Sequence, residues 1–153
     1  MESKQFAMRM GIIEPICENT LRDLLIDGKK AGFLFDIRLN YYRGHFLSVI
    51  DTLRVFIDGC EMPVGSIQLK LNGKSFGIHE FARLSYEFWN VLQPATIVVI
   101  QPGGLADGEH EVELELMIRS PYMAIGPDHQ YMPVDLGGKR TMLLQKTKEV
   151  RNG

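Results

Sequence analysis

HEVELELMIR, at residues 110–119, carries the strongest structural signal in this chain. Glutamates alternate with apolar residues along it, and an alternation of period two is typical of a β-strand with one buried and one solvent-facing side. The apolar positions are Val112, Leu114, Leu116 and Ile118. We therefore predict a strand here whose apolar side covers a hydrophobic core.

The same period recurs elsewhere in the chain. It predicts further strands over residues 33–41, 49–57, 67–71, 74–76, 96–100 and 141–144. Asp58-Gly59 and Asn72-Gly73 tolerate positive φ and are typical of tight turns between strands. Alternation stops between residues 78 and 89, which favours a short helix or an irregular aromatic segment. Residues 122–138 are rich in Gly, Pro and Asp and predict no element.

These patterns predict an all-β fold, an antiparallel two-sheet β-sandwich with one short helical segment. The length of 153 residues, with 45% hydrophobic and 24% charged residues, is typical of one globular domain over residues 1–153. Within it, residues 1–31 predict one or two edge strands, and residues 146–153 a frayed tail.

Charge and cysteine content indicate which partners and which cellular compartment this chain is expected to have. The 17 basic and 19 acidic residues give a net charge of −2, which argues against nucleic acid as the main partner. Cys17 and Cys60 stand far apart, which suits a reducing compartment, with a single bridge between them as the alternative. No signal peptide or membrane-spanning apolar run occurs, so we expect a cytoplasmic protein.

The sequence shows no catalytic or metal-binding motif, and we predict that this chain holds no catalytic residue, cofactor or metal ligand of its own. Its four histidines are scattered without ligand spacing. Two loops combine polar and aromatic residues and are candidate binding surfaces. Their residues are Tyr42, Arg43 and His45 in one, and Tyr122, His129 and Tyr131 in the other. Asp128 and Asp135 with His129 form an alternative divalent-metal site.

A series of segments, taken in order, resembles the small (beta) subunit of bacterial C-glycoside deglycosidases. The resemblance covers residues 32–144. It rests on GFLFDIR (32–38), YYRG (41–44), VFIDG (55–59), LNGK (71–74), FWNVLQPAT (88–96), GGLADGEHEV (103–112) and RSPY (119–122).

This resemblance implies a non-catalytic β-sandwich subunit that works with a larger (β/α)8-barrel alpha subunit. The partner is expected to carry the catalytic groups and a divalent metal, usually manganese. The complex is a lyase that cleaves the C–C bond between aglycone and sugar in 3-keto C-glycosides, including those of flavonoids. Aromatic and methionine residues in irregular segments would then form contact surface. They are Phe81, Tyr86, Phe88, Trp89, Tyr122, Met123, Tyr131 and Met132.

The alternative is a stand-alone carbohydrate-binding β-sandwich. In that hypothesis, exposed aromatic side chains such as Trp89 and Tyr131 would serve as platforms on which sugar rings stack.

Overall fold

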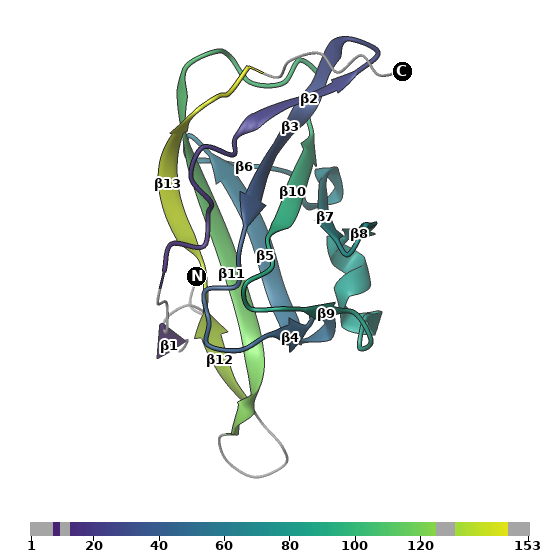
Figure 1. Ribbon diagram of the computed structural model, residues 1–153, viewed down its shortest axis with the longest axis vertical. Coiled ribbons are helices and arrows are strands. Elements are labelled where there is room, and N and C mark those ends of the chain that lie inside the picture. Colours follow the sequence, from purple (N-terminus) through teal and green to yellow (C-terminus); the bar gives the residue numbers. More distant parts are fainter. Residues whose placement is uncertain (1–7, 10–12, 125–130, 147–153) are drawn as a thin grey trace.

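The computed structural model describes residues 8–9, 13–124 and 131–146, with side chains for residues 13–119 and 133–146. Two β-sheets pack face to face along the length of the molecule (Figure 1). The predicted all-β sandwich is confirmed. None of the described helices has the length and hydropathy needed to cross a lipid bilayer.

The first sheet is built around one long strand, β11 (Glu109–Ala124). Its order is β1 (Met8–Arg9), β12 (Tyr131–Asp135), β11, β5 (Ile50–Ile57) and β6 (Cys60–Glu61), while β13 (Gly138–Leu143) also pairs with β11. All these pairs are antiparallel except β1 with β12. β11 therefore holds the sheet together, as its strong alternation suggested.

The second sheet has the order β2 (Arg22–Ile26), β3 (Lys29–Ile37), β10 (Ala95–Ile100), β7 (Ile67–Leu71) and β8 (Lys74–Gly77). Its hairpins turn at Asp27-Gly28 and Asn72-Gly73, where both residues have positive φ. Such turns match the right-handed twist of the flanking strands. The predicted hairpin and the predicted inner strand over residues 96–100 are both confirmed.

A small third sheet pairs β4 (His45–Phe46) with β9 (Phe88–Trp89). Short 3-10 helices connect the strands: η1 (Leu47–Val49), η2 (Val64–Ser66) and η3 (Ile78–Arg83). The helical segment predicted between residues 78 and 89 is thus confirmed over its first part, whereas its last residues form β9.

The core lies between the two large sheets and follows the predicted alternation. From β3, Phe33, Phe35 and Ile37 are fully buried, and from β11, Val112 and Leu116 face them across the core. Burial of such side chains stabilises the fold by about 1.5–3 kcal/mol each.

Some boundaries differ from those predicted. The strand predicted over residues 33–41 ends at Ile37, because the chain beyond it pairs with an N-terminal segment in a less regular way: Arg38 donates to the carbonyl oxygen of Pro15. β11 continues past Pro121 to Ala124, with a shift of register that accommodates a residue lacking an N–H group.

The expectation of no element over residues 122–138 is wrong, since β12 and the start of β13 lie there. The edge strands expected near the N-terminus are confirmed as β1 and β2. Of the tail predicted over residues 146–153, only Lys146 lies within the described part of the chain.

Candidate functional site

The fold brings the first predicted binding loop and the strand ends that flank the second to the same end of the molecule. β5 begins at Ile50, which pairs with Ile118, and β4 and η1 come directly before it. β11 runs on to Ala124 beside β12 alone. As a result, β4 and β9 lie near the end toward which the β11–β12 hairpin projects (Figure 1).

The residues of the second loop are only partly placed. Tyr122 lies in β11 and Tyr131 in β12, where it pairs with Ala124. The structure describes neither their side chains nor those of Met123 and Met132. Asp128 and His129 lie outside the described residues.

The small β4–β9 sheet has an inner and an outer side. His45 and Trp89 pair across it and point inward, being 3% and 1% exposed. On the outer side Phe46 pairs with Phe88, and their rings meet edge to face with centroids 4.9 Å apart. Tyr86 is two residues before Phe88 and is 73% exposed. The outward-facing side chains of this sheet are therefore aromatic.

Two further exposed residues extend this surface, Tyr42 on the loop before β4 and Leu92 on the turn after β9. We call the surface formed by Tyr42, Phe46, Tyr86, Phe88 and Leu92 the aromatic end. The pairing of β4 with β9 brings their segments together, and exposed apolar side chains gathered in this way are typical of interaction sites in globular proteins.

The loop before β4 packs closely on β9. A side chain at Gly44 would meet the Trp89 carbonyl oxygen at 2.5 Å and the Phe88 ring at 2.7 Å, so only glycine allows this contact. The guanidinium carbon of Arg43 lies 5.3 Å from the centroid of the Tyr42 ring, a cation–π arrangement. Tyr42 and Arg43 are thus displayed together at the surface.

His45 supports this loop from the inside. Its ring lies 5.0 Å from that of Tyr41, which is also buried. Burial, followed by the charge of Arg43, lowers the pKa of His45 to about 4. The imidazole is therefore neutral at neutral pH, and it acts as a packed aromatic ring of the loop.

A buried carboxylate fixes the segment that follows η3. Glu87 accepts hydrogen bonds from Asn72 Nδ2 at 2.8 Å and Lys74 Nζ at 3.0 Å, and these two bonds lower its pKa. Gln93 donates to Asn72 Oδ1 at 2.7 Å and accepts from Trp89 Nε1 at its carbonyl oxygen at 2.8 Å. The Asn72-Gly73 hairpin thereby anchors residues 87–93.

The expectation that Trp89 is an exposed stacking platform is wrong. Its indole is buried because it lies on the inner side of β9, and its one polar atom is bonded within the chain. Phe81 is likewise part of the core. The contact surface expected from aromatic residues is therefore limited, among the described side chains, to Tyr86 and Phe88 of that set.

Within residues 13–119 and 133–146, no group of three or more His, Cys, Asp or Glu residues is arranged to hold a metal ion. Asp135, part of the alternative metal site, is buried and accepts a hydrogen bond from the Gly137 amide at 3.0 Å. Cys17 and Cys60 are free thiols, and burial raises the pKa of Cys17.

His110 joins β11 to the β5–β6 turn. Its Nδ1 lies 2.7 Å from Asp58 Oδ2, and its Nε2 lies 2.7 Å from the Ala106 carbonyl oxygen. Both partners are acceptors, so only the imidazolium donates to both at once. Burial lowers the pKa of His110, but the bonds to Ala106 and Asp58 outweigh it, and the pKa is raised. The bond from His110 lowers the pKa of Asp58.

This arrangement predicts a pH-dependent contribution to stability. Because the folded pKa of His110 lies above the unfolded value of 6.5, the stabilisation is fully present below pH 6.5 and is lost as pH rises through the folded pKa. We expect the free energy of unfolding, measured in urea, to fall over this window in the wild type and to stay level in His110→Gln. The exposed His79→Gln is the control, and an unchanged slope in His110→Gln would contradict the prediction.

Comparisons with known proteins place these features in a family. The family model described as C-glycoside deglycosidase beta subunit matches residues 13–122. A protein of Eubacterium cellulosolvens named C-glycoside deglycosidase beta subunit is 34% identical over 116 residues, covering 70% of this chain and 79% of the relative. A protein of Microbacterium trichothecenolyticum with the same name is 31% identical over 128 residues, covering 82% of this chain and 90% of the relative.

A third relative, from a Microbacterium species, is named 3'-dehydrocarminate deglycosidase beta subunit and is 33% identical over 97 residues, covering 63% of this chain and 72% of the relative. Fold and surface together define a β-sandwich with an exposed aromatic end. The chain belongs to the C-glycoside deglycosidase beta subunit family.

Proposed function

We propose that this chain is the accessory beta subunit of a heteromeric C-glycoside deglycosidase. The observation that carries the proposal is the family match over residues 13–122, together with relatives that are named beta subunits. A beta subunit has a partner, which in this proposal is a larger alpha subunit with a (β/α)8 barrel. We place the complex in the cytoplasm.

The proposed reaction is an elimination from a 3-keto C-glycoside. The ketone acidifies the proton on C2, so a base can remove it. The C2–H bond and the bond from C1 to the aglycone carbon break, a C1=C2 double bond forms, and the aglycone carbon takes up a proton. A divalent metal held by the larger subunit, manganese in this proposal, would stabilise negative charge on the sugar oxygen. A flavonoid is the proposed class of aglycone.

The role of this chain is to complete the reaction chamber of its partner. We propose that the loop with Tyr42, Arg43 and His45 and the hairpin with Tyr122, His129 and Tyr131 face the larger subunit or its active site. The first loop, and the ends of β11 and β12 that carry Tyr122 and Tyr131, lie near one end of the sandwich, which supports this assignment, since one partner could contact both (Figure 1). No catalytic group is assigned to this chain.

Co-expression with the larger subunit tests the proposal. We expect the two chains to co-purify, and release of aglycone from a 3-keto C-glycoside to require the mixture, with each chain alone at least about a hundredfold less active. Aglycone release is followed by chromatography. Full activity of this chain alone as a monomer, or failure of the two chains to associate, would overturn the proposal.

The stand-alone carbohydrate-binding hypothesis has lost its main platform, because Trp89 is buried. Calorimetric titration of the isolated chain with mono- and disaccharides is therefore expected to show no binding up to about millimolar concentration. Micromolar affinity in the absence of any partner would favour this alternative over the subunit role.

A further inference from the structure

We infer that the aromatic end is the docking surface for an acidic face of the larger subunit, an inference that rests on the proposed function. Beyond the two loops already assigned to the contact, it includes β9 and the turn after it in the docking surface. It also specifies that the contacting face of the partner is acidic. Exposure, fixed geometry and charge each support it.

Exposure comes first. Leu92 is 82% exposed, Tyr86 73% and Tyr42 50%, and Phe46 lies beside Phe88 on the same side of the small sheet. Large apolar side chains on adjacent segments rarely stay in water unless they bind something. Aromatic side chains are enriched at interface cores between proteins, and phenylalanine rings bring no polar group for a sugar hydroxyl. A protein surface is therefore the occupant that fits.

Fixed geometry is the second support. Glu87 lies between Tyr86 and Phe88 and is hydrogen-bonded to Asn72 and Lys74. Gln93 closes the turn that contains Leu92, because its side chain accepts from the Asn90 amide at 3.2 Å. The exposed side chains are thus carried on a backbone that is already ordered, which reduces the entropy lost on association.

Charge indicates the partner's chemistry. Within residues 41–46 and 72–93, the exposed charged side chains are Arg43, Lys74 and Arg83, and of these Lys74 forms an ion pair with Glu87. The carboxylates there are at least half-buried: Glu87 is held as described, and Glu80 accepts from the Gly77 amide at 2.8 Å. Electrostatic complementarity therefore favours an acidic partner surface.

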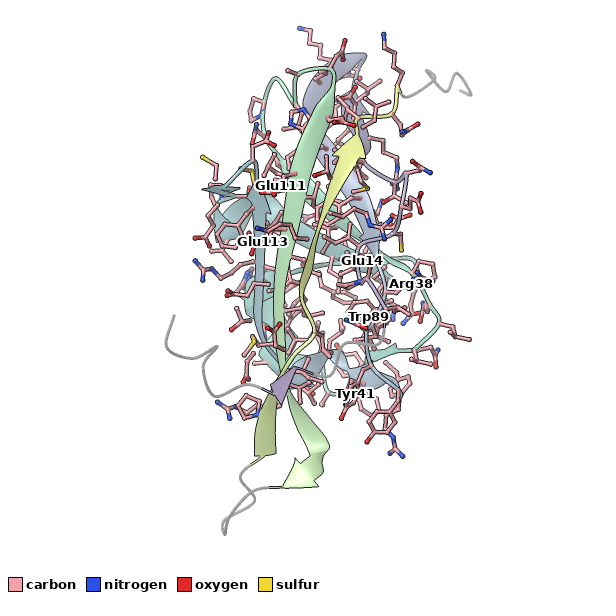
Figure 2. The ribbon with its side chains drawn as sticks, turned by 90° about the vertical axis from the view of Figure 1, so that its left-hand side faces the viewer. Glu14, Arg38, Tyr41, Trp89, Glu111 and Glu113 are labelled. Atoms are coloured by element: carbon pink, nitrogen blue, oxygen red, sulfur yellow. The ribbon has the colours of Figure 1, made fainter. Side chains whose placement is uncertain are left out.

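Among the described residues, carboxylates are frequent on the outer side of the first sheet. Glu111 and Glu113 lie along β11, well away from Tyr41, the buried neighbour of Tyr42 in the aromatic end (Figure 2). The nearby turn and strand ends expose Asp58 and Glu61. Several of these carboxylates are already ion-paired, Glu61 and Glu115 with Arg54 and Glu111 with Lys139, and no exposed arginine free of such pairs is described beside them, so this side is the less suitable surface for an acidic partner.

A groove beside Tyr86 provides a place for a partner side chain. It has a volume of about 450 Å³ and is lined by Ser75, Phe76, Glu80, Arg83, Leu84 and Tyr86. Arg83 forms no ion pair among the residues that the structure describes. An acidic side chain of the larger subunit that enters the groove would meet this guanidinium.

The test measures the affinity of the purified chain for the purified larger subunit by isothermal titration calorimetry. The patch variants are the double variant Tyr86→Ser with Leu92→Ser, and Arg83→Glu. Their matched controls are the double variant Ile26→Ser with Leu143→Ser, at residues that are 53% and 54% exposed, and Lys29→Glu at the start of β3. Circular dichroism confirms that each variant is folded.

We expect the double patch variant to weaken binding about tenfold or more, and the controls to bind within about twofold of the wild type. Arg83→Glu is expected to weaken binding and to reduce its dependence on salt. Patch variants that bind as the wild type does would overturn this inference alone. A wild-type chain that binds no larger subunit would instead overturn the proposed function.

Self-association is distinguished by sedimentation of the isolated chain. We expect the wild type to stay a monomer. A dimer that the Tyr86→Ser, Leu92→Ser variant loses, while that variant keeps its affinity for the larger subunit, would assign the aromatic end to a second copy and would overturn the inference.

Discussion

Replacing Gly32 with alanine is expected to lower the free energy of unfolding by about 3 kcal/mol. Gly32 lies in β3, between β2 and β10, and pairs with Leu24 on one side and with Ile100 on the other. An added Cβ would lie 1.9 Å from the Val99 carbonyl oxygen and 2.9 Å from the Gln101 amide nitrogen. Val99 belongs to β10, and Gln101 follows the last residue of that strand. Because both atoms belong to the backbone, the added Cβ fits only if β3 and β10 move apart.

Gly65→Ala is the matched control, since an added Cβ there meets no atom within 4 Å. Thermal unfolding should show Gly32→Ala melting about 6–12 °C below the wild type, with Gly65→Ala within about 2 °C. Equal melting temperatures for the two variants would show that β3 and β10 are spaced differently from the arrangement described.

Trp89→Ala is expected to cost about 4 kcal/mol of unfolding free energy. The side chain is 1% exposed, so its loss leaves a void in the core beneath β9. It also leaves the Gln93 carbonyl oxygen without the hydrogen bond that Trp89 Nε1 donates. Since Trp89 supports the backbone that carries Phe88, we also expect weaker binding of the larger subunit. Urea unfolding measures the first effect and calorimetry the second.

Tyr86→Ala is the control for this variant, because its ring is 73% exposed and its removal should change stability by less than about 0.5 kcal/mol. A stability loss of the same size in both variants would contradict the assignment of Trp89 to the inside and Tyr86 to the outside of the segment.

The sheets could be predicted largely from alternation. Phe33, Phe35 and Ile37, or Val112 and Leu116, repeat at period two because one side of each strand faces a core. The Asn72-Gly73 turn was also predictable, since few residue pairs accept two successive positive φ angles.

β12 was missed for a physical reason. Its five residues contain Pro133, and pairing with β11 and β1 on either side makes them a strand. Residues 120–124 of β11 were missed because Pro121 is tolerated only where the register shifts. Neither condition is visible in local sequence.

The candidate site was predicted only in part. The loop with Tyr42 and Arg43 is exposed at the expected position, but a two-residue strand such as β4 is too short for alternation to show which side faces the core. The burial of His45 and Trp89 was therefore not predicted, and Phe46 and Leu92 were not singled out as exposed residues. The pairing of Phe46 with Phe88 across 42 residues of sequence is the signal that could not be read from the chain.

β11 has a mechanical consequence. The strand is continuous from the core, where it pairs with β5 up to Ile118, to its end at Ala124. At about 3.3 Å per residue, this extension reaches about 20 Å beyond the last pair with β5. The backbone of this arm continues into the centre of the first sheet, and the shift of register between Arg119 and Ala124 is where the arm can bend when a neighbour displaces its tip.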